Sequence, residues 1–274
     1  EKPNRAIVIS AGNFGNSNLH QSGYLTQETI INWKMNSARE ESDENSDFDF
    51  LEIWYSDEDD ITVEICNDEL CYRSKFILND ETFQILDKTK QKIIGEIYHC
   101  SGEFFDNQIF IARSVCDTNN GTWFIKLIPN SIKSDGKYHA FLEIPSSRNS
   151  SELTNSTSDC TLGSIATGEN SIVVSSYRVS GTRDFSYFSS IGPTRTGKYK
   201  PEFCASGQDI WAAASKTTST RKDSGTSQAA PVITGIVARI FSVALARNIN
   251  LTIDQTREIL ISSADITDFK INDE

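Results

Sequence analysis

A serine stands where a helix is expected to begin, in the run Gly225-Thr226-Ser227-Gln228-Ala229-Ala230-Pro231. From Thr226 to Arg247 apolar residues recur at helical spacing, which predicts a helix over that range. The first N–H groups of a helix lack partners within it, and its N-terminus carries partial positive charge, so an oxyanion formed beside Ser227 would be stabilised there. Ser227 is therefore a candidate nucleophile. The alternative is that Thr226 or Ser227 is an ordinary helix cap.

An asparagine between two glycines is the second candidate, in the run Ser10-Ala11-Gly12-Asn13-Phe14-Gly15 after a predicted strand at 5–10. A neutral amide N–H can stabilise a developing oxyanion without being neutralised by it, and losing one such donor costs about 10²–10³ in rate. Asn13 is therefore a candidate oxyanion donor. By itself, the same residue would be interpreted as a turn asparagine.

These runs, together with two others, resemble the motifs of the subtilisin-like serine peptidases in the family's own order. The serine run, with Val232-Ile233-Thr234-Gly235 after it, is similar to G-T-S-x-[AS]-x-P, and the asparagine run is similar to A-A-G-N-x-G. Between them, Asp184 to Pro193 and Lys200 to Gly207 look like F-S-S-x-G-P and K-P-D-x-x-A-P-G. The resemblance covers residues 5–18 and 163–265.

The resemblance implies an α/β fold, part of a subtilisin-like parallel-sheet domain, and a secreted or cell-envelope serine endopeptidase as the parent protein. Ser227 would attack the peptide carbonyl, and Asn13 with the Ser227 N–H would form the oxyanion hole. Ser10, Ala11 and Gly12 would form the floor of the pocket for the residue before the scissile bond. No cofactor or metal is predicted, although structural calcium is compatible with the resemblance. The implied partner is a peptide or protein substrate.

The family motifs for the catalytic acid, D-[ST]-G, and base, H-G-T-H, are absent from the chain, and none of His20, His99 and His139 lies in a similar segment. A serine hydroxyl needs a hydrogen-bonded base to take its proton. We therefore expect the chain alone to be inactive and a missing N-terminal part of the protein to carry the Asp and His. A second hypothesis is a non-catalytic scaffold whose inserted domain binds protein or glycan.

β-type runs separated by polar turns fill the middle of the chain, among them Thr29–Met35 and Phe48–Tyr55, and they predict an antiparallel sandwich or jelly roll. The resulting domains are 1–22 and 159–274 for the subtilisin-like part and 23–158 for the insert, with an exposed linker over 146–158. Trp54 and Trp123 are interpreted as sandwich core rather than as a sugar-stacking platform. The acidic stretch from Glu40 to Asp60 is interpreted as a solvated loop rather than a cation site.

The bulk composition excludes some classes of partner. Lys and Arg total 26 against 38 Asp and Glu, and this net charge of −12 would repel a phosphate backbone, so nucleic acid is not expected as a partner. We predict no membrane span because no continuous run of about 18 apolar residues occurs. The six cysteines lack the spacing of a zinc site, and their pairing cannot be derived from the sequence.

Overall fold

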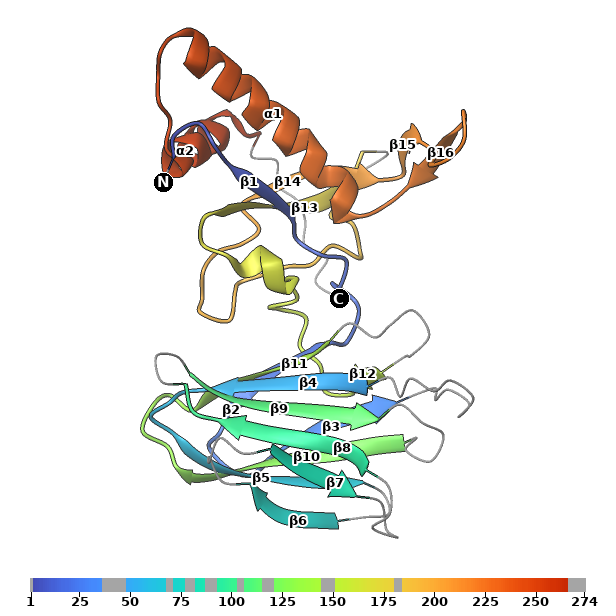
Figure 1. Ribbon diagram of the computed structural model, residues 1–274, viewed down its shortest axis with the longest axis vertical. Helices are drawn as coiled ribbons and strands as arrows, with labels where there is room; N and C mark the ends of the chain where they lie inside the picture. Colours follow the sequence, from blue (N-terminus) through green and yellow to red (C-terminus); the bar gives the residue numbers. More distant parts are fainter. Residues whose placement is uncertain are drawn as a thin grey trace. The chain divides into compact units, whose positions relative to one another are not determined.

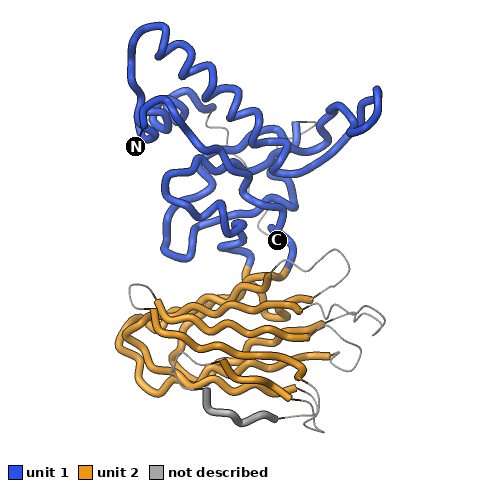
Figure 2. Tube along the Cα trace, viewed as in Figure 1, with its two compact units in different colours: residues 1–17, 158–274 blue, residues 18–157 orange. Residues whose placement is uncertain are grey.

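The chain divides into two units in the computed structural model (Figure 1). Unit 1 comprises Glu1–Ser17 and Ser158–Glu274, and unit 2 comprises Asn18–Thr157 (Figure 2). The structure describes residues 2–35, 48–67, 71–76, 82–86, 93–102, 106–114, 121–143, 151–179 and 184–265. Each unit has a hydrophobic core of its own.

Unit 1 is built on three parallel strands in the order β1 (Ile7–Ser10), β13 (Ser171–Arg178) and β14 (Phe203–Gln208). The first six residues of the central strand β13 are all buried, as expected of a parallel strand covered on both faces. Ligands of such sheets bind outside the carboxyl ends of the strands. The residues that follow Ser10 therefore lie at the edge where a site is expected.

One face of this sheet is covered by α1 (Thr226–Ala246) and α2 (Ile253–Ser263). Ala229, Ile233 and Val237 of α1 pack in one cluster with Ile172 and Val174 of β13. The described part of unit 1 also contains the 3₁₀ helix η2 (Ser164–Thr167) and the hairpin of β15 (Ile210–Ala213) and β16 (Thr220–Asp223). The hairpin directly precedes the predicted nucleophile, and the sequence analysis did not predict it.

The helix α1 is also long and apolar enough to cross a membrane, judged by length and composition only. One such helix is weak support for a span because the core helix of a soluble protein passes the same test. In unit 1, the face with Ala229 and Ile233 packs on the sheet. The expectation of no membrane span stays a prediction.

Unit 2 consists of two antiparallel sheets that share one core. One has five strands in the order β12-β3-β10-β5-β6, and the other has six in the order β2-β11-β4-β9-β8-β7. The strands are β2 (His20–Tyr24), β3 (Thr29–Met35), β4 (Phe48–Tyr55), β5 (Asp60–Asn67), β6 (Cys71–Phe76), β7 (Thr82–Leu86), β8 (Ile93–Cys100), β9 (Asn107–Ser114), β10 (Gly121–Ser131), β11 (Lys137–Leu142) and β12 (Ser151–Leu153). Buried and partly exposed residues alternate strictly along β4, the pattern of a strand with one face in the core.

The core of unit 2 contains two tryptophans and a buried arginine. Trp33 and Trp123 pack edge to face with ring centroids 6.1 Å apart, and the guanidinium of Arg113 lies 4.9 Å from the Trp123 ring centroid. Trp123 therefore is a core residue. Trp54 is not: it alternates with buried residues of β4 on the outer face, where its Nε1 donates to Glu52 Oε2 at 3.2 Å.

Two stretches expected to be exposed instead contribute to unit 2. Residues 151–153 of the expected linker form β12, and Leu153 is fully buried in the core. The acidic stretch contains the predicted strand Phe48–Tyr55 as β4, and Asp59, expected in a solvated loop, is buried, with its carboxylate accepting from the backbone N–H groups of Lys133 and Ser134. Residues 40–47 and 146–150 of these stretches lie outside the described residues.

The architecture is a strand-rich α/β fold with parallel and antiparallel sheets. The expected boundary after residue 22 falls inside β2, whereas all of β2 belongs to unit 2, where it pairs with β11 and His20 is the register partner of Phe141. That unit 2 is a jelly roll stays a prediction.

Candidate active site

Asn13 lies in the loop that leaves β1 at the carboxyl edge of the parallel sheet. Backbone hydrogen bonds continue beyond the end of β1: Ala11 N donates to Val174 O at 2.9 Å, and Ala11 O accepts from Gly163 N at 2.9 Å. Gly12 then turns the chain with φ of +112°, a conformation that side-chain-bearing residues rarely adopt. The asparagine that follows is exposed.

A second motif holds this loop from the other side. Ser190 N donates to Gly12 O at 2.9 Å, and Ser190 Oγ accepts from Phe14 N at 3.0 Å. A Cβ atom at Gly15 would come within 2.5 Å of Ser189 O, so the close approach of the two segments requires a glycine there. The segments resembling A-A-G-N-x-G and F-S-S-x-G-P therefore pack directly on each other.

The predicted nucleophile lies in the first turn of α1. Gly225 precedes the helix, and its N–H donates to Gly207 O at 2.8 Å, which ties the helix start to the end of β14. Thr226 is buried with 1% exposure, whereas Ser227 is exposed. Ser227 is thus an exposed residue at the positive end of the helix dipole.

Asn13 and the start of α1 meet in unit 1, although 213 positions separate Asn13 from Thr226. Asn13 Oδ1 accepts hydrogen bonds from Thr226 N at 2.9 Å and from Thr226 Oγ1 at 3.0 Å. A Cβ at Gly225 would lie 3.2 Å from Asn13 Nδ2, so the glycine leaves room beside the amide nitrogen. Sequence reasoning considered Thr226 only as a helix cap, and nothing in its position alone indicated a bond to Asn13.

The three residues expected to form the pocket floor differ in their surroundings. The side chain of Ala11 is fully buried in a cluster with Leu162, Ala166 and Val173, so only its backbone could face a substrate. Ser10 and Gly12 are partly exposed. One groove of unit 1, with a volume of about 640 Å³, is lined by residues of α1 and by Leu251, and another, of about 800 Å³, is lined by residues of α1 and β1. Neither Ser227 nor Asn13 lines either groove.

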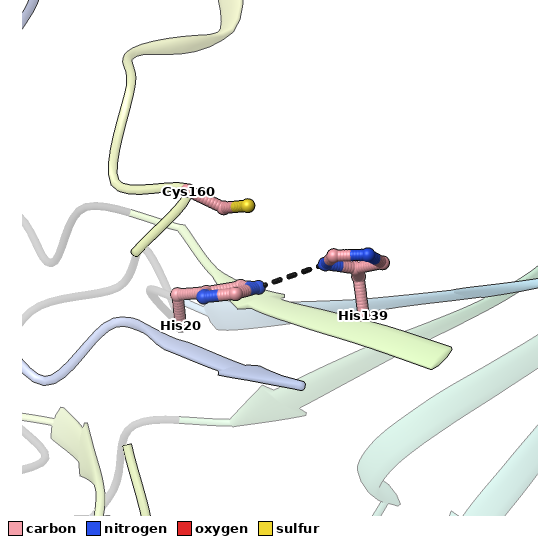
Figure 3. A group of neighbouring side chains, drawn as sticks. All are labelled: His20, His139 and Cys160. Carbon is pink, nitrogen blue, oxygen red and sulfur yellow. Dashed lines mark hydrogen bonds between the residues drawn. The ribbon is translucent and has the colours of Figure 1, made fainter. Parts of the chain in front are cut away.

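All three histidines of the chain belong to unit 2. His20 Nε2 and His139 Nδ1 form a hydrogen bond at 3.1 Å (Figure 3), and His20 Nδ1 contacts Thr157 Oγ1 at 2.8 Å. His99 Nε2 contacts the hydroxyl of Tyr55 at 2.5 Å. Unit 1, which carries Ser227, contains no imidazole of its own.

The model of the subtilase family matches residues 114–274, more than half of the chain. The chain belongs to the subtilase family. The match includes Ser227, the predicted nucleophile of this subtilase, but not Asn13. No protein in the curated set matches.

Solved structures that align with this subtilase include two proteases. The CspB protease of Clostridium perfringens aligns with a TM-score of 0.75 at 23% identity, over 96% of this chain and 54% of that chain. At that identity the likeness shows the fold alone, and the subtilase chain spans about half of the length of the matched one. The prenylagaramide maturation protease PagA aligns at 24% identity over 39% of this chain and 37% of that chain, with a TM-score of 0.33.

Proposed function

We propose that the protein to which this chain belongs is a serine endopeptidase. Ser227 Oγ attacks the carbonyl carbon of a peptide bond, a base takes the hydroxyl proton, and an acyl-enzyme forms as the amine leaves. The oxyanion of the tetrahedral intermediate accepts hydrogen bonds from Asn13 Nδ2 and the Ser227 N–H. The observation that carries the proposal is the bonding of the Asn13 amide to Thr226, beside the exposed Ser227.

We also propose that the base and the acid come from an N-terminal part of the protein outside this chain. Unit 1 contains no histidine, so it cannot supply the family's base. Among the described strands β1 has a neighbour on one side only, and Ile7 is 66% exposed. Parallel sheets are normally buried, so the open edge of β1 is a suitable place for a further parallel strand from that N-terminal part.

The proposed substrate is a peptide or protein, and the proposed location is extracellular or the cell envelope, as the resemblance implies. Ser10 and the backbone of Ala11 and Gly12 would border the residue before the scissile bond. No cofactor takes part in the proposed reaction.

A fluorophosphonate probe tests the proposal by labelling activated serines. We expect the full-length protein to be labelled stoichiometrically at Ser227, the Ser227→Ala variant to remain unlabelled, and the present chain to react very slowly because its base is missing. Rapid stoichiometric labelling of this chain alone would contradict the missing base. If the full-length protein neither reacts with the probe nor cleaves peptides, the peptidase proposal fails.

The alternative, a non-catalytic scaffold with a binding function in unit 2, makes a different prediction for the gene. An upstream reading frame with D-[ST]-G and then H-G-T-H supports the peptidase, whereas a frame with neither motif supports the scaffold. The outward position of Trp54 on β4 is the structural observation compatible with a binding surface.

A further inference from the structure

Two histidines of unit 2 lie side by side on the outer face of the six-stranded sheet. In the register of β2 with β11, His20 is opposite Phe141 and His139 is opposite Ser22, so the histidines are diagonal neighbours on one face. Ala140, the residue after His139, is on the opposite face and packs in the core. Although they are outside this core, His20 and His139 are only 1% and 4% exposed. The two imidazoles are therefore shielded from water without being part of the apolar core.

The two rings point nitrogen atoms at each other. His20 Nε2 lies 3.1 Å from His139 Nδ1 (Figure 3). Zinc binds imidazole nitrogens at about 2.0–2.1 Å with tetrahedral angles, which places two such nitrogens about 3.3–3.4 Å apart. A movement of either ring by about 0.3 Å would therefore let one ion take the place of the hydrogen between the two nitrogens.

The second ring nitrogen of His20 has the partner that a metal-binding histidine needs. Its Nδ1 lies 2.8 Å from Thr157 Oγ1. A neutral imidazole has one N–H and one lone pair, so a bond from Nδ1–H to the threonine oxygen directs the lone pair of Nε2 toward His139. Histidine ligands of metals usually donate their second N–H in this way. Thr157 N also donates to His20 O at 2.7 Å, and this backbone bond keeps the two residues together.

We propose that His20 and His139 are two ligands of a late first-row transition-metal ion, with Zn²⁺ as the expected metal, which ties β2 to β11 in unit 2. Imidazole nitrogen suits zinc, copper and nickel, whereas magnesium and calcium prefer oxygen ligands. Two positions of a tetrahedral ion remain for water or another donor. The sequence analysis did not predict this site because 119 positions separate the two histidines, far from any zinc-type spacing. The proposed site does not depend on the proposed peptidase function.

Metal binding by the present chain tests the proposal. After bound metals have been removed with a chelator, we expect the wild-type chain to bind about one equivalent of Zn²⁺ in equilibrium dialysis, with no displacement by excess Mg²⁺ or Ca²⁺. His20→Ala and His139→Ala should each weaken binding by at least about tenfold, a loss that even the residues behind metal ligands typically cause. Undiminished binding by either variant would overturn the proposal.

The third histidine of the chain provides the matched control. His99 is also buried, and its Nε2 contacts the hydroxyl of Tyr55 rather than another imidazole. His99→Ala should therefore bind Zn²⁺ as the wild-type chain does. Near-ultraviolet circular dichroism of all three variants shows whether each one is folded.

A measurement on the wild-type chain avoids any effect of the substitutions on folding. In NMR spectra, addition of Zn²⁺ should shift the imidazole signals of His20 and His139 and leave those of His99 unchanged. Unchanged signals of His20 and His139 would overturn the proposal and leave the pair as a hydrogen bond between two imidazoles. Equal shifts at all three histidines, with several equivalents bound, would mean adventitious binding only and would also overturn it.

Discussion

Single residues in this chain act mainly through hydrogen bonds that fix a neighbour. The backbone N–H and the hydroxyl of Thr226 both donate to Asn13 Oδ1, and Gly225 leaves space beside Nδ2. In unit 2, the buried carboxylate of Asp59 fixes a turn in a similar way, because it accepts hydrogen bonds from Lys133 N at 2.8 Å and Ser134 N at 2.9 Å. These bonds can be tested one side chain at a time.

The carboxylate of Asp59 should make the stability of unit 2 depend on pH. Burial by itself raises the pKa of this carboxyl, but the hydrogen bonds from the Ser134 hydroxyl and the two backbone N–H groups outweigh it and hold the pKa below its ordinary value. A lowered folded-state pKa means that the stabilisation is fully present above the unfolded pKa of about 3.9 and is lost as pH falls through the folded value.

We therefore expect Asp59→Asn to lower the free energy of unfolding at pH 7 by about 1.5–3 kcal/mol, the usual size of hydrogen bonds to a charged group. Urea unfolding at several pH values measures the difference, which should shrink below about pH 4 as the wild-type carboxylate is protonated. Asp57→Asn, at an exposed position nearby, is the control and should have little effect. An Asp59 penalty that is constant from pH 7 to pH 2.5 would contradict the argument.

Among the elements, the ends of helices and strands carry the candidate site. The first turn of α1 contains Ser227 and the loop after β1 contains Asn13, whereas the middle of α1 packs on the sheet through Ala229 and Ile233. The start of α2 shows how local signals set such ends. The cap of α2 is Thr252, whose Oγ1 accepts from Gln255 N at 3.2 Å while Gln255 Oε1 accepts from Thr252 N at 3.0 Å, and Asp254 lies in the first turn of the helix.

This reciprocal capping box should contribute to the stability of unit 1. We expect Thr252→Ala to lower the free energy of unfolding by about 1 kcal/mol because the Gln255 N–H loses its acceptor, and Thr252→Ser to cost much less. Urea unfolding followed by circular dichroism measures both variants. Asp254→Ala serves as the comparison, and if it proves more damaging than Thr252→Ala, the assignment of the cap is wrong.

At the scale of the whole molecule, unit 2 contains the features of an independent domain. Residues of both sheets form its core, including Trp33, Ile53 and Trp123, each of which is at most 1% exposed. Its two ends lie together, since Thr157 N donates to His20 O at 2.7 Å and Leu153 N donates to Asn18 O at 2.8 Å. A segment with adjacent ends and its own core can be inserted into, or removed from, another domain.

We expect a fragment of residues 18–157 to fold without unit 1. The measurements are near-ultraviolet circular dichroism, which reports the packing of Trp33 and Trp123, and cooperative unfolding in urea. The fragment with Trp123→Ala should be much less stable, since removing a buried tryptophan costs about 3–5 kcal/mol. A wild-type fragment without near-ultraviolet signal or a cooperative transition would mean that unit 2 depends on unit 1.

The sequence alone predicted the features of the protein that local residue patterns encode. Alternation predicted strands such as Thr29–Met35 and Phe48–Tyr55 at their observed bounds, helical spacing predicted α1, and the ordered motifs indicated the subtilase family. The sequence did not predict β12, a strand with few apolar residues, or the hairpin β15–β16. Pairing with other strands, rather than the propensity of their residues, stabilises these elements. The outward position of Trp54 likewise depends on strand register, which composition does not reveal.

Only the tertiary structure decided that the Asn13 loop and the start of α1 meet and which atoms they share. No sequence pattern carries the hydrogen bonds of the Asn13 amide with Thr226, because they join segments more than two hundred positions apart through the parallel sheet. Sequence patterns report what each segment prefers by itself. Contacts between distant segments depend on how the packed sheet and helix bring their ends together, so they appear only once the chain is folded.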